Sequence, residues 1–248
     1  MARDEPLLIE ERDGITILSL NRPQRRNAID AALAGALRGA FEAAGAARAI
    51  VVRSAHAGMF CSGADLGVGD DERAHVSREL YVLYGQMIAT GAPIVAALDG
   101  PAVGGGAQLA VACDLRVAGP GASVRFLGPG HGLAVGAWAL PSLVGRGRAL
   151  DLCLTGRTVQ RDEALAIGLV DRLADNANAA AAELATALAA LEPDAVARVK
   201  AVAARALTDG AASALALEAD GNARWRGGTP GLRRPRSAER ASRDGSGR

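Results

Sequence analysis

The chain has 248 residues, half of them hydrophobic, which is enough to bury the core of one domain, with or without a helical appendage. Its formal net charge of +1 gives no general attraction to nucleic acid or anionic membranes, and no apolar run approaches the length of a membrane span. The N-terminus is charged and lacks the apolar segment of a signal peptide. Cys61, Cys113 and Cys153 lie far apart among apolar residues, which indicates buried thiols in a reducing compartment rather than disulfides or a metal site. We therefore expect a cytoplasmic protein with no membrane span, no nucleic-acid partner and no metal.

The first part of the chain predicts a hairpin, a helix and a strand. Residues 7–11 and 15–20 are apolar segments that flank an Asp-Gly turn, which is typical of a β-hairpin. Asp30 would cap an alanine-rich helix over residues 31–44, and residues 48–53 form a second short apolar strand. The polar stretch 67–74, with three acids in a row at 70–72, indicates a mobile, solvated loop before a helix over about residues 76–90.

The stretch 92–117 is the one around which we expect the fold to be organised. Residues 94–98 are five consecutive apolar residues between a proline and an Asp-Gly pair, typical of a buried strand, although periodicity alone leaves a buried helix open. A glycine triplet at 104–106 follows, and from residue 107 towards 117 apolar residues recur at helical spacing. The order is a strand, a glycine-rich turn and a helix.

The glycine triplet has two possible roles. Glycines immediately before a helix leave N–H groups that no side chain covers, so an anionic oxygen can approach them, as in an oxyanion hole. Alternatively, the glycines only allow close packing of the helix. The triplet matches neither the dinucleotide-binding fingerprint nor the P-loop.

The remainder of the chain predicts two short strands followed mostly by helices. Residues 115–118 and 123–126 are the expected strands, and a loop at 128–132 leads through residues 133–144 to a helix over about 147–154. Further helices are expected over residues 162–167, 176–191, 194–207 and 211–218. The alternation of strands and helices favours an α/β core.

Three regions are expected along the chain. Residues 1–173 would form the core with the ligand pocket, and residues 174–222 a C-terminal helical region. Residues 223–248 form an arginine-rich tail, with eight arginines against two acids and little apolar content. Such a composition predicts a poorly ordered tail or an arm that docks on a neighbouring subunit.

Several motifs between residues 7 and 173 lie in the same order as in a known family. The two central ones are FCSGADL at 60–66 and, some forty residues later, DGPAVGGG at 99–106 with CDLR at 113–116. They are accompanied by NRP at 21–23, NAI at 27–29, LTGR at 154–157, EA at 163–164 and GLV at 168–170. With these motifs the chain resembles the crotonase (enoyl-CoA hydratase/isomerase) superfamily.

This resemblance implies an α/β fold, a crotonase-like spiral of ββα repeats with a helical C-terminal region, assembled as homotrimers or dimers of trimers. It also implies an acyl-CoA ligand, with coenzyme A as part of the substrate and no further cofactor. The thioester carbonyl would accept hydrogen bonds from the N–H groups of Ala64 and Gly105, which together would form an oxyanion hole. The residues that match the region around coenzyme A in relatives are Arg25, Arg26, Ala28, Asp65 and Leu66. The two arginines suit the phosphates of coenzyme A, with a merely exposed loop as the alternative.

The catalytic pattern of the family is broken in this sequence. Relatives that hydrate enoyl-CoA use two glutamates, and the matching positions hold Gln108 and Gly130. An amide can orient a water or a carbonyl but cannot take up a proton at neutral pH. His131 is a possible replacement for the missing acid/base, or an ordinary loop residue. The carboxylates at 70–72 and Asp99 are further groups that a substrate could recruit.

Two function classes therefore remain open. The first is an enzyme of the enoyl-CoA hydratase/isomerase type with altered acid/base groups, and the second is a non-catalytic fatty acyl-CoA-binding protein. Only the enzyme needs a titratable group within reach of the acyl chain. A serine hydrolase is a remote third reading, because the chain has three histidines and no Gly-x-Ser-x-Gly motif. Trp138 is expected in the core rather than in an acyl pocket.

Overall fold

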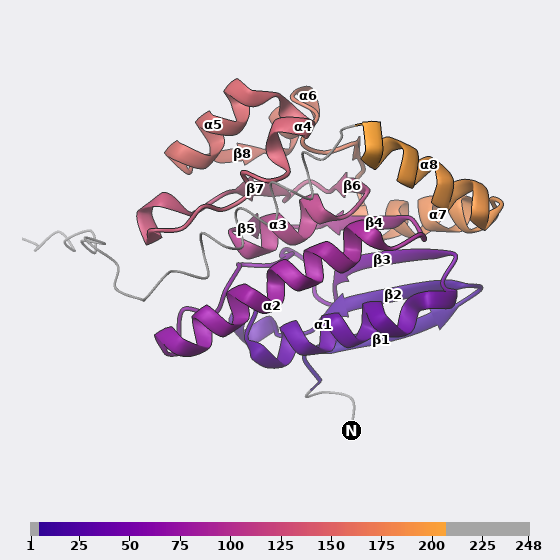
Figure 1. The fold of residues 1–248 in the computed structure, drawn as a ribbon, viewed down its shortest axis with the longest axis horizontal. Coiled ribbons are helices and arrows are strands. Elements are labelled where there is room, and N and C mark those ends of the chain that lie inside the picture. Colours follow the sequence, from indigo (N-terminus) through magenta and orange to yellow (C-terminus); the bar gives the residue numbers. More distant parts are fainter. Residues whose placement is uncertain (1–4, 207–248) are drawn as a thin grey trace, which may run out of the picture.

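The protein is described by a computed structural model that covers residues 5–206, and it is built on two β-sheets (Figure 1). The larger sheet has the strand order β1-β2-β3-β4-β6-β9, in which only the β1–β2 pair is antiparallel. Its strands are β1 (Leu7–Arg12), β2 (Ile15–Leu20), β3 (Ala49–Ser54), β4 (Ile94–Leu98), β6 (Leu115–Ala118) and β9 (Arg172–Leu173). The smaller sheet has the order β5-β7-β8, with strands β5 (Pro101–Val103), β7 (Ser123–Arg125) and β8 (Thr158–Gln160). The expected α/β architecture is confirmed.

The N-terminal hairpin forms where the sequence predicts it. Arg12 pairs with Ile15, so the connection is a tight two-residue turn. Its two residues, Asp13 and Gly14, both have positive φ, 52° and 78°. Positive φ at both central positions matches the twist of a two-residue hairpin, and an Asp-Gly pair tolerates it well.

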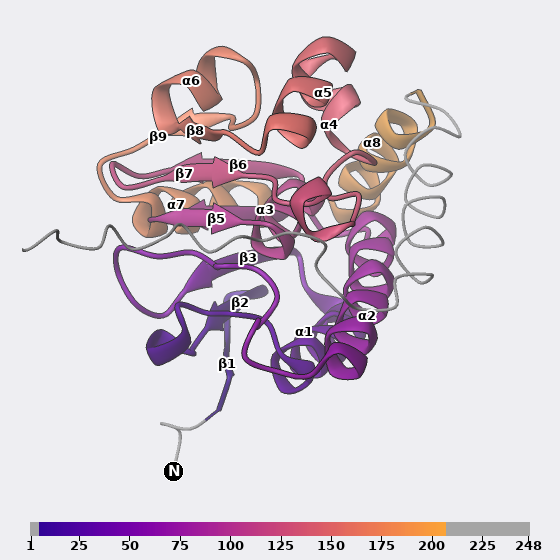
Figure 2. The ribbon, with the colours of Figure 1, turned by 90° about the vertical axis from the view of Figure 1, so that its left-hand side faces the viewer.

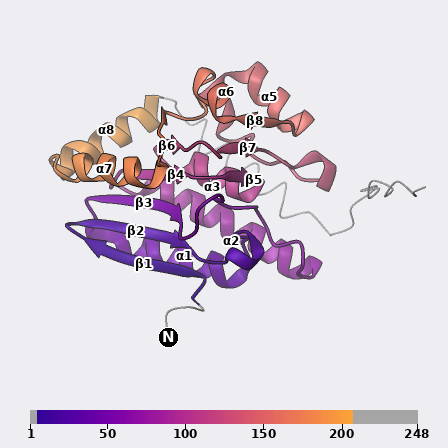
Figure 3. The ribbon, with the colours of Figure 1, turned by 180° about the vertical axis from the view of Figure 1, so that it is seen from behind.

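The central strands are apolar without interruption because both faces of the large sheet are covered. In β3, Ile50 and Val52 belong to a core shared with α1 (Ala31–Ala43) and α2 (Asp70–Ala89), while Val51 faces a second core. The second core is closed by α7 (Ala177–Ala189), which packs over β3, β4 and β6 (Figure 3). A parallel sheet buried on both sides is expected to show such runs.

Successive turns of the chain repeat one pattern, as the family resemblance implies. One turn places β4 in the large sheet, β5 in the small sheet and then α3 (Gly105–Ala112), and the next places β6 and β7 in the same two sheets. In the last turn the order is reversed, since β8 and α6 (Arg161–Ala166) precede β9. Figure 2 shows α6 with α4 (Leu140–Val144) and α5 (Arg146–Thr155) at the end of the molecule opposite β1.

The C-terminal helix of the described chain, α8 (Pro193–Ala206), is fastened to the core by the only lysine of the sequence. Lys200 Nζ lies 2.6 Å from Asp114 Oδ2 and donates to the Ala92 carbonyl oxygen at 2.8 Å. Asp114 Oδ2 also accepts from the N–H of Ile94 at 2.7 Å. The helix expected over 211–218 and the arginine-rich tail lie outside the described residues. Within residues 5–206, no helix is both long and apolar enough to cross a bilayer.

Several predicted boundaries were wrong. The stretch 67–74 is not all loop, because α2 begins at Asp70 and its three acids occupy the first turn, where the helix dipole stabilises negative charge. Helix α3 begins at Gly105, inside the glycine triplet, and ends at Ala112. Strands β5, β8 and β9 and the short helix α4 were not anticipated. Three short 3-10 helices complete the structure described here, at Pro23–Arg25, Ala44–Ala46 and Pro129–His131.

Candidate active site

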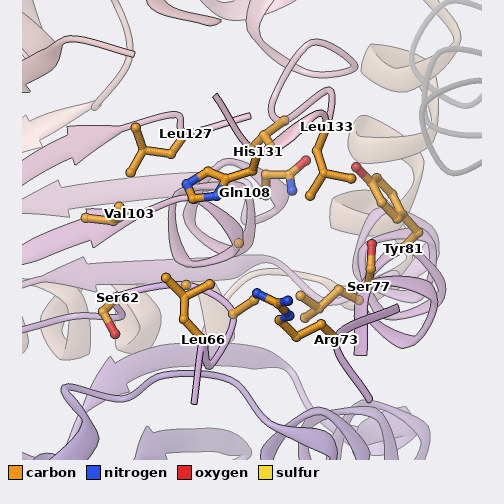
Figure 4. A pocket seen from close by; sticks show the side chains of 16 residues that line it. Ser62, Leu66, Arg73, Ser77, Tyr81, Val103, Gln108, Leu127, His131 and Leu133 are labelled. Atoms are coloured by element: carbon orange, nitrogen blue, oxygen red, sulfur yellow. The ribbon is translucent and has the colours of Figure 1, made fainter. Parts of the chain in front are cut away.

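One cavity brings together half of the candidate site residues named from the sequence (Figure 4). Four segments form its walls: the loop at 62–66, helix α2, the junction of β5 with α3, and the segment 127–135. The lining residues are Ser62, Gly63, Ala64, Leu66, Arg73, Ser77, Leu80, Tyr81, Val103, Gly104, Gly105, Gln108, Leu127, His131, Leu133 and Val135. Ala64, Leu66, Gly105, Gln108 and His131 were candidates from sequence, whereas the α2 residues were missed.

Two backbone N–H groups face this cavity. Gly105 is the first residue of α3, so its N–H has no acceptor within the helix. Ala64 lies in a loop held by its neighbours, since Ile29 donates to Gly63 at 2.7 Å and Asp65 donates to Ile29 at 2.9 Å. Neither the Ala64 nor the Gly105 N–H donates to an acceptor within residues 5–206. A Cβ placed on Gly105 would lie 3.6 Å from the Ala64 nitrogen, so the two donors border one small space.

The glycines of this region differ in their surroundings: Gly106 is closely packed, whereas Gly105 borders the cavity. A Cβ on Gly106 would lie 2.7 Å from Cys61 Cβ and 2.8 Å from Cys61 Sγ, so this glycine allows close packing. Gly63 has φ +91°, and its Cβ would lie 2.6 Å from the Val103 carbonyl oxygen. Gly105 instead lines the cavity, where the absent side chain leaves its N–H accessible. Close packing by two glycines therefore fixes the position of the donors next to them.

Two tyrosines on α2 connect the opposite sides of the site. The hydroxyl of Tyr84 donates to the Gly105 carbonyl oxygen at 2.9 Å, next to the donor pair. The hydroxyl of Tyr81 donates to the Ala134 carbonyl oxygen at 3.3 Å, in the opposite wall. The rings meet edge to face with centroids 5.8 Å apart. Helix α2 is therefore hydrogen-bonded to both of these walls of the cavity.

Gln108 is buried, with 4% of its surface exposed, and its side chain is held by two donors. Its Oε1 accepts from the backbone N–H of Gly136 and from Nε1 of Trp138, each at 3.0 Å. Trp138 is buried and stacks on Tyr84, with ring centroids 5.9 Å apart, which confirms its expected place in the core. Because both partners of the amide can only donate, the oxygen faces them and the NH₂ group is left for the cavity.

The segment 127–135 contributes His131 but not Gly130 to the cavity wall. Both belong to the short 3-10 helix Pro129–His131, in which Gly130 is exposed and His131 half-buried. A Cβ on Gly130 would meet nothing within 4 Å. In the part of the chain that the structure describes, no aspartate or glutamate lines the cavity, so none of the carboxylates considered as recruits, at 70–72 and at Asp99, reaches it.

Helix α2 adds two polar residues that the sequence reasoning missed, Arg73 and Ser77. They lie one turn apart on the cavity face of the helix, and Arg73 forms an ion pair with Asp70. Residues 70–74 were expected to be loop, so nothing in the sequence reasoning placed their side chains at the site. A helical reading that started at Asp70 would have put Arg73, Ser77, Leu80 and Tyr81 on one face.

Of the residues matched to the coenzyme A region, only Leu66 lines the cavity. Leu66 is 65% exposed, and Arg25 and Arg26 are also exposed. Nη1 of Arg25 lies near Gly67, 3.7 Å from where a Cβ on that glycine would be. Ala28 is buried.

Asp65 lies in the same loop, where its carboxylate is paired with Gly67 and Arg22. Its Oδ1 accepts from the N–H of Gly67 at 2.9 Å, and its Oδ2 lies 3.3 Å from Nη1 of Arg22. The hydrogen bond from Gly67, with a further contribution from Arg22, holds the pKa of Asp65 below its ordinary value although burial opposes this. Arg22 also pairs with Asp30 at 2.7 Å, so this arginine ties the loop of Ala64 to the start of α1.

Comparisons with known proteins agree on one family. A family model described as enoyl-CoA hydratase/isomerase matches residues 10–224. The "Probable enoyl-CoA hydratase echA6" of Mycobacterium tuberculosis is 39% identical over 199 residues, which cover 78% of this chain and 80% of the relative. The crystal structure of an enoyl-CoA hydratase/isomerase from Xanthobacter autotrophicus Py2 has a TM-score of 0.80 at 30% identity and covers 91% of this chain and 89% of its own. That of an enoyl-CoA hydratase from Thermoplasma volcanium GSS1 has a TM-score of 0.76 at 28% identity, covering 88% and 91%.

Proposed function

Because the chain belongs to the enoyl-CoA hydratase/isomerase family, we propose that it binds an acyl-CoA thioester with the carbonyl oxygen between the N–H groups of Ala64 and Gly105. Its fold is the crotonase fold of that family, as the solved relatives show. The observation that carries the proposal is the pair of backbone donors that border one space in the cavity wall and have no acceptor among the residues described.

The two donors suit a thioester carbonyl because negative charge can build up on its oxygen. When an acyl-CoA is converted to an enolate or attacked by water, that oxygen becomes an oxyanion. A preorganised N–H in such a place is worth about 3 kcal/mol towards the transition state. The apolar walls of the cavity, with Leu80, Leu133 and Val135, would accept the acyl chain.

Arg25 is the better placed of the two arginines to meet the phosphates of coenzyme A. Its guanidinium lies near Gly67, next to Leu66 at the rim of the cavity. It is exposed, so it can pair with a phosphate without first breaking a buried interaction.

We propose further that enoyl-CoA hydration is slow or absent. The position matched to one family glutamate holds an amide, and no carboxylate lines the cavity among the residues described. General acid and base groups each contribute roughly 10² to 10⁴ to a rate, so an oxyanion hole without them leaves most of the barrier in place. The function supported best is therefore the binding of a fatty acyl-CoA, for delivery or sensing.

A second candidate function rests on His131. Its imidazole is part of the cavity wall, where the matched Gly130 is not. A histidine can act as acid and base near neutral pH, so it could replace the glutamates in a slow hydratase or isomerase.

One assay separates the two functions. The protein at high concentration is mixed with a short trans-2-enoyl-CoA, and the absorbance of the enoyl thioester is followed while binding is measured independently by calorimetry. The binding function predicts a calorimetric signal with constant absorbance. Decay of the absorbance that His131→Ala abolishes would establish the second candidate, and absence of binding would refute both.

A further inference from the structure

The amide nitrogen of Gln108 is a donor in the cavity wall, accessible from the cavity and with no partner among the described residues. Gln108 lines the cavity and is only 4% exposed, so its NH₂ group cannot turn to bulk solvent. Figure 4 shows the amide within the ring of lining side chains, on the same side as His131. A buried donor left without an acceptor costs free energy whenever the cavity is filled by an apolar group.

The direction of this amide is set by its surroundings. Gly136 N–H and Trp138 Nε1–H both donate to Oε1 at 3.0 Å. A flipped amide would place its NH₂ group against these two donors, which is unfavourable. The NH₂ group of Gln108 therefore presents N–H donors to the cavity, where a glutamate at the same position would present a carboxylate oxygen.

The amide and one of the two backbone donors belong to the same helix. Gln108 is three residues after Gly105 on α3, which puts both on one face of the helix. Side chains of a helix lean towards its N-terminus, so the amide extends from Gln108 towards Gly105. An acceptor that meets the amide must therefore be near the thioester oxygen along the acyl chain.

We propose that the site selects acyl-CoA thioesters that carry a hydrogen-bond-accepting oxygen on C3, as in 3-oxoacyl-CoA, over saturated and 2-enoyl thioesters. The inference rests on the proposed function, because it assumes that the thioester oxygen is bound by Ala64 and Gly105. In a 1,3-dicarbonyl group the two oxygens can lie side by side, so the first can meet the backbone donors while the second accepts from Gln108 Nε2. A saturated or 2-enoyl chain offers no acceptor there and leaves the buried amide unpaired.

An oxygen on the ligand that accepts from the Gln108 amide would not be repelled by a carboxylate from the described cavity wall. Among residues 5–206, the polar side chains that line the cavity are Ser62, Arg73, Ser77, Tyr81, Gln108 and His131, none of which is a carboxylate. A ketone or hydroxyl oxygen on C3 therefore meets no carboxylate from the wall. The amide takes no proton in this interaction, so it is a recognition group for the acyl chain.

The test compares three four-carbon thioesters at pH 7 by calorimetry: 3-oxobutanoyl-CoA, butanoyl-CoA and trans-2-butenoyl-CoA. The native protein is expected to bind the 3-oxo compound about tenfold more tightly than the other two, the gain from satisfying one buried donor. In Gln108→Glu, one carboxylate oxygen can still accept from Gly136 and Trp138, while the other faces the ligand as an acceptor. We expect this variant to bind 3-oxobutanoyl-CoA at least tenfold more weakly than the native protein and to lose the preference for it over butanoyl-CoA.

Gln160→Glu is the matched control, because it makes the same chemical change at an exposed position outside the cavity. It should retain the native preference. Equal affinity of the native protein for all three thioesters would overturn the inference and leave the proposed function standing, since an amide satisfied by a retained water gives that result. If none of the three thioesters binds, the proposed function fails and the inference fails with it.

Discussion

Gly106 and Gly130, on the two sides of the cavity, differ in how much room they leave for an added side chain. On the donor side, Gly63 and Gly106 pack so closely that a single added carbon would collide with Val103 or Cys61. On the opposite side, Gly128 is also closely packed, since its Cβ would lie 2.6 Å from the Leu133 carbonyl oxygen, but a carbon added to Gly130 would meet nothing within 4 Å. His131 reaches the cavity from the short 3-10 helix that contains Gly130. In the proposed complex, the donor side would fix the position of the carbonyl oxygen, whereas the exposed turn at 129–131 would leave the group that faces the acyl chain open to substitution.

This difference has a consequence for function within the family. Backbone donors cannot be changed by a substitution unless the fold around them changes, but a side chain on the opposite wall can be replaced at little structural cost. A chain can therefore keep acyl-CoA binding while its acid/base chemistry is lost or altered. Gln108 lies between the two cases, because its oxygen is fixed by Gly136 and Trp138 while its nitrogen faces the ligand.

The largest expected effect is on the free energy of unfolding, when alanine replaces one glycine on each side of the cavity. Gly106→Ala places a Cβ against the Cys61 carbonyl oxygen and side chain, so the free energy of unfolding should fall by about 3 kcal/mol, or the protein should fail to fold. Gly130→Ala should change it by less than about 0.5 kcal/mol. Urea unfolding followed by circular dichroism measures both variants. Equal losses of unfolding free energy in the two variants would show that positions 106 and 130 do not differ as described.

A second substitution separates packing from ligand access on the donor side. In Gly105→Ala, the new Cβ lies 3.2 Å from Cδ1 of Leu80, which can move aside, and 3.6 Å from the Ala64 nitrogen. We expect at least a tenfold loss of affinity for butanoyl-CoA, because the methyl group enters the space of the carbonyl oxygen. The free energy of unfolding should change by less than about 1 kcal/mol. Calorimetric binding and urea unfolding of the same preparation check the two parts, and unchanged affinity would remove Gly105 from the site.

The smallest expected effect is on the free energy of unfolding, when Asp65 is replaced in the loop that carries Ala64. Because the folded pKa of Asp65 lies below its ordinary value of 3.8, its stabilising contribution is complete well above that pH and is lost as the pH falls through the folded pKa. Asp65→Asn should therefore be less stable than the native protein at pH 7, by roughly 1–2 kcal/mol for a charge-assisted hydrogen bond. The difference should shrink below pH 4. Unfolding curves at pH 7, 5 and 3 test this, and a difference independent of pH would exclude ionised Asp65 as its source.

The sequence predicted the parts of the fold that local chemistry determines. The Asp-Gly hairpin and the apolar runs of β3 and β4 carry their own signals of turn geometry and double-sided burial. Strands β5, β8 and β9 have two or three residues, too few to show a period. The start of α2 was missed because its N-cap, Gly69, offers no side chain and its first turn is acidic, which resembles a solvated loop.

The candidate site was predicted where it depends on motifs and missed where it depends on packing. Ala64, Gly105, Gln108 and His131 stand in or beside recognisable segments, and all four line the cavity. The contribution of α2 follows from the crossing of that helix over α3, which no local pattern encodes. The domain boundaries, the trimeric assembly and the contacts to coenzyme A stay predictions.

The central claim, a thioester carbonyl held by Ala64 and Gly105, is tested most directly by isotope-edited infrared spectroscopy of bound butanoyl-CoA labelled with ¹³C at the carbonyl carbon. Two hydrogen bonds from fixed donors polarise the C=O bond, so the stretching frequency should fall below its value in water on binding to the native protein. The fall should be smaller in any complex that Gly105→Ala still forms. A bound thioester that absorbs at or above the frequency in water would contradict the account.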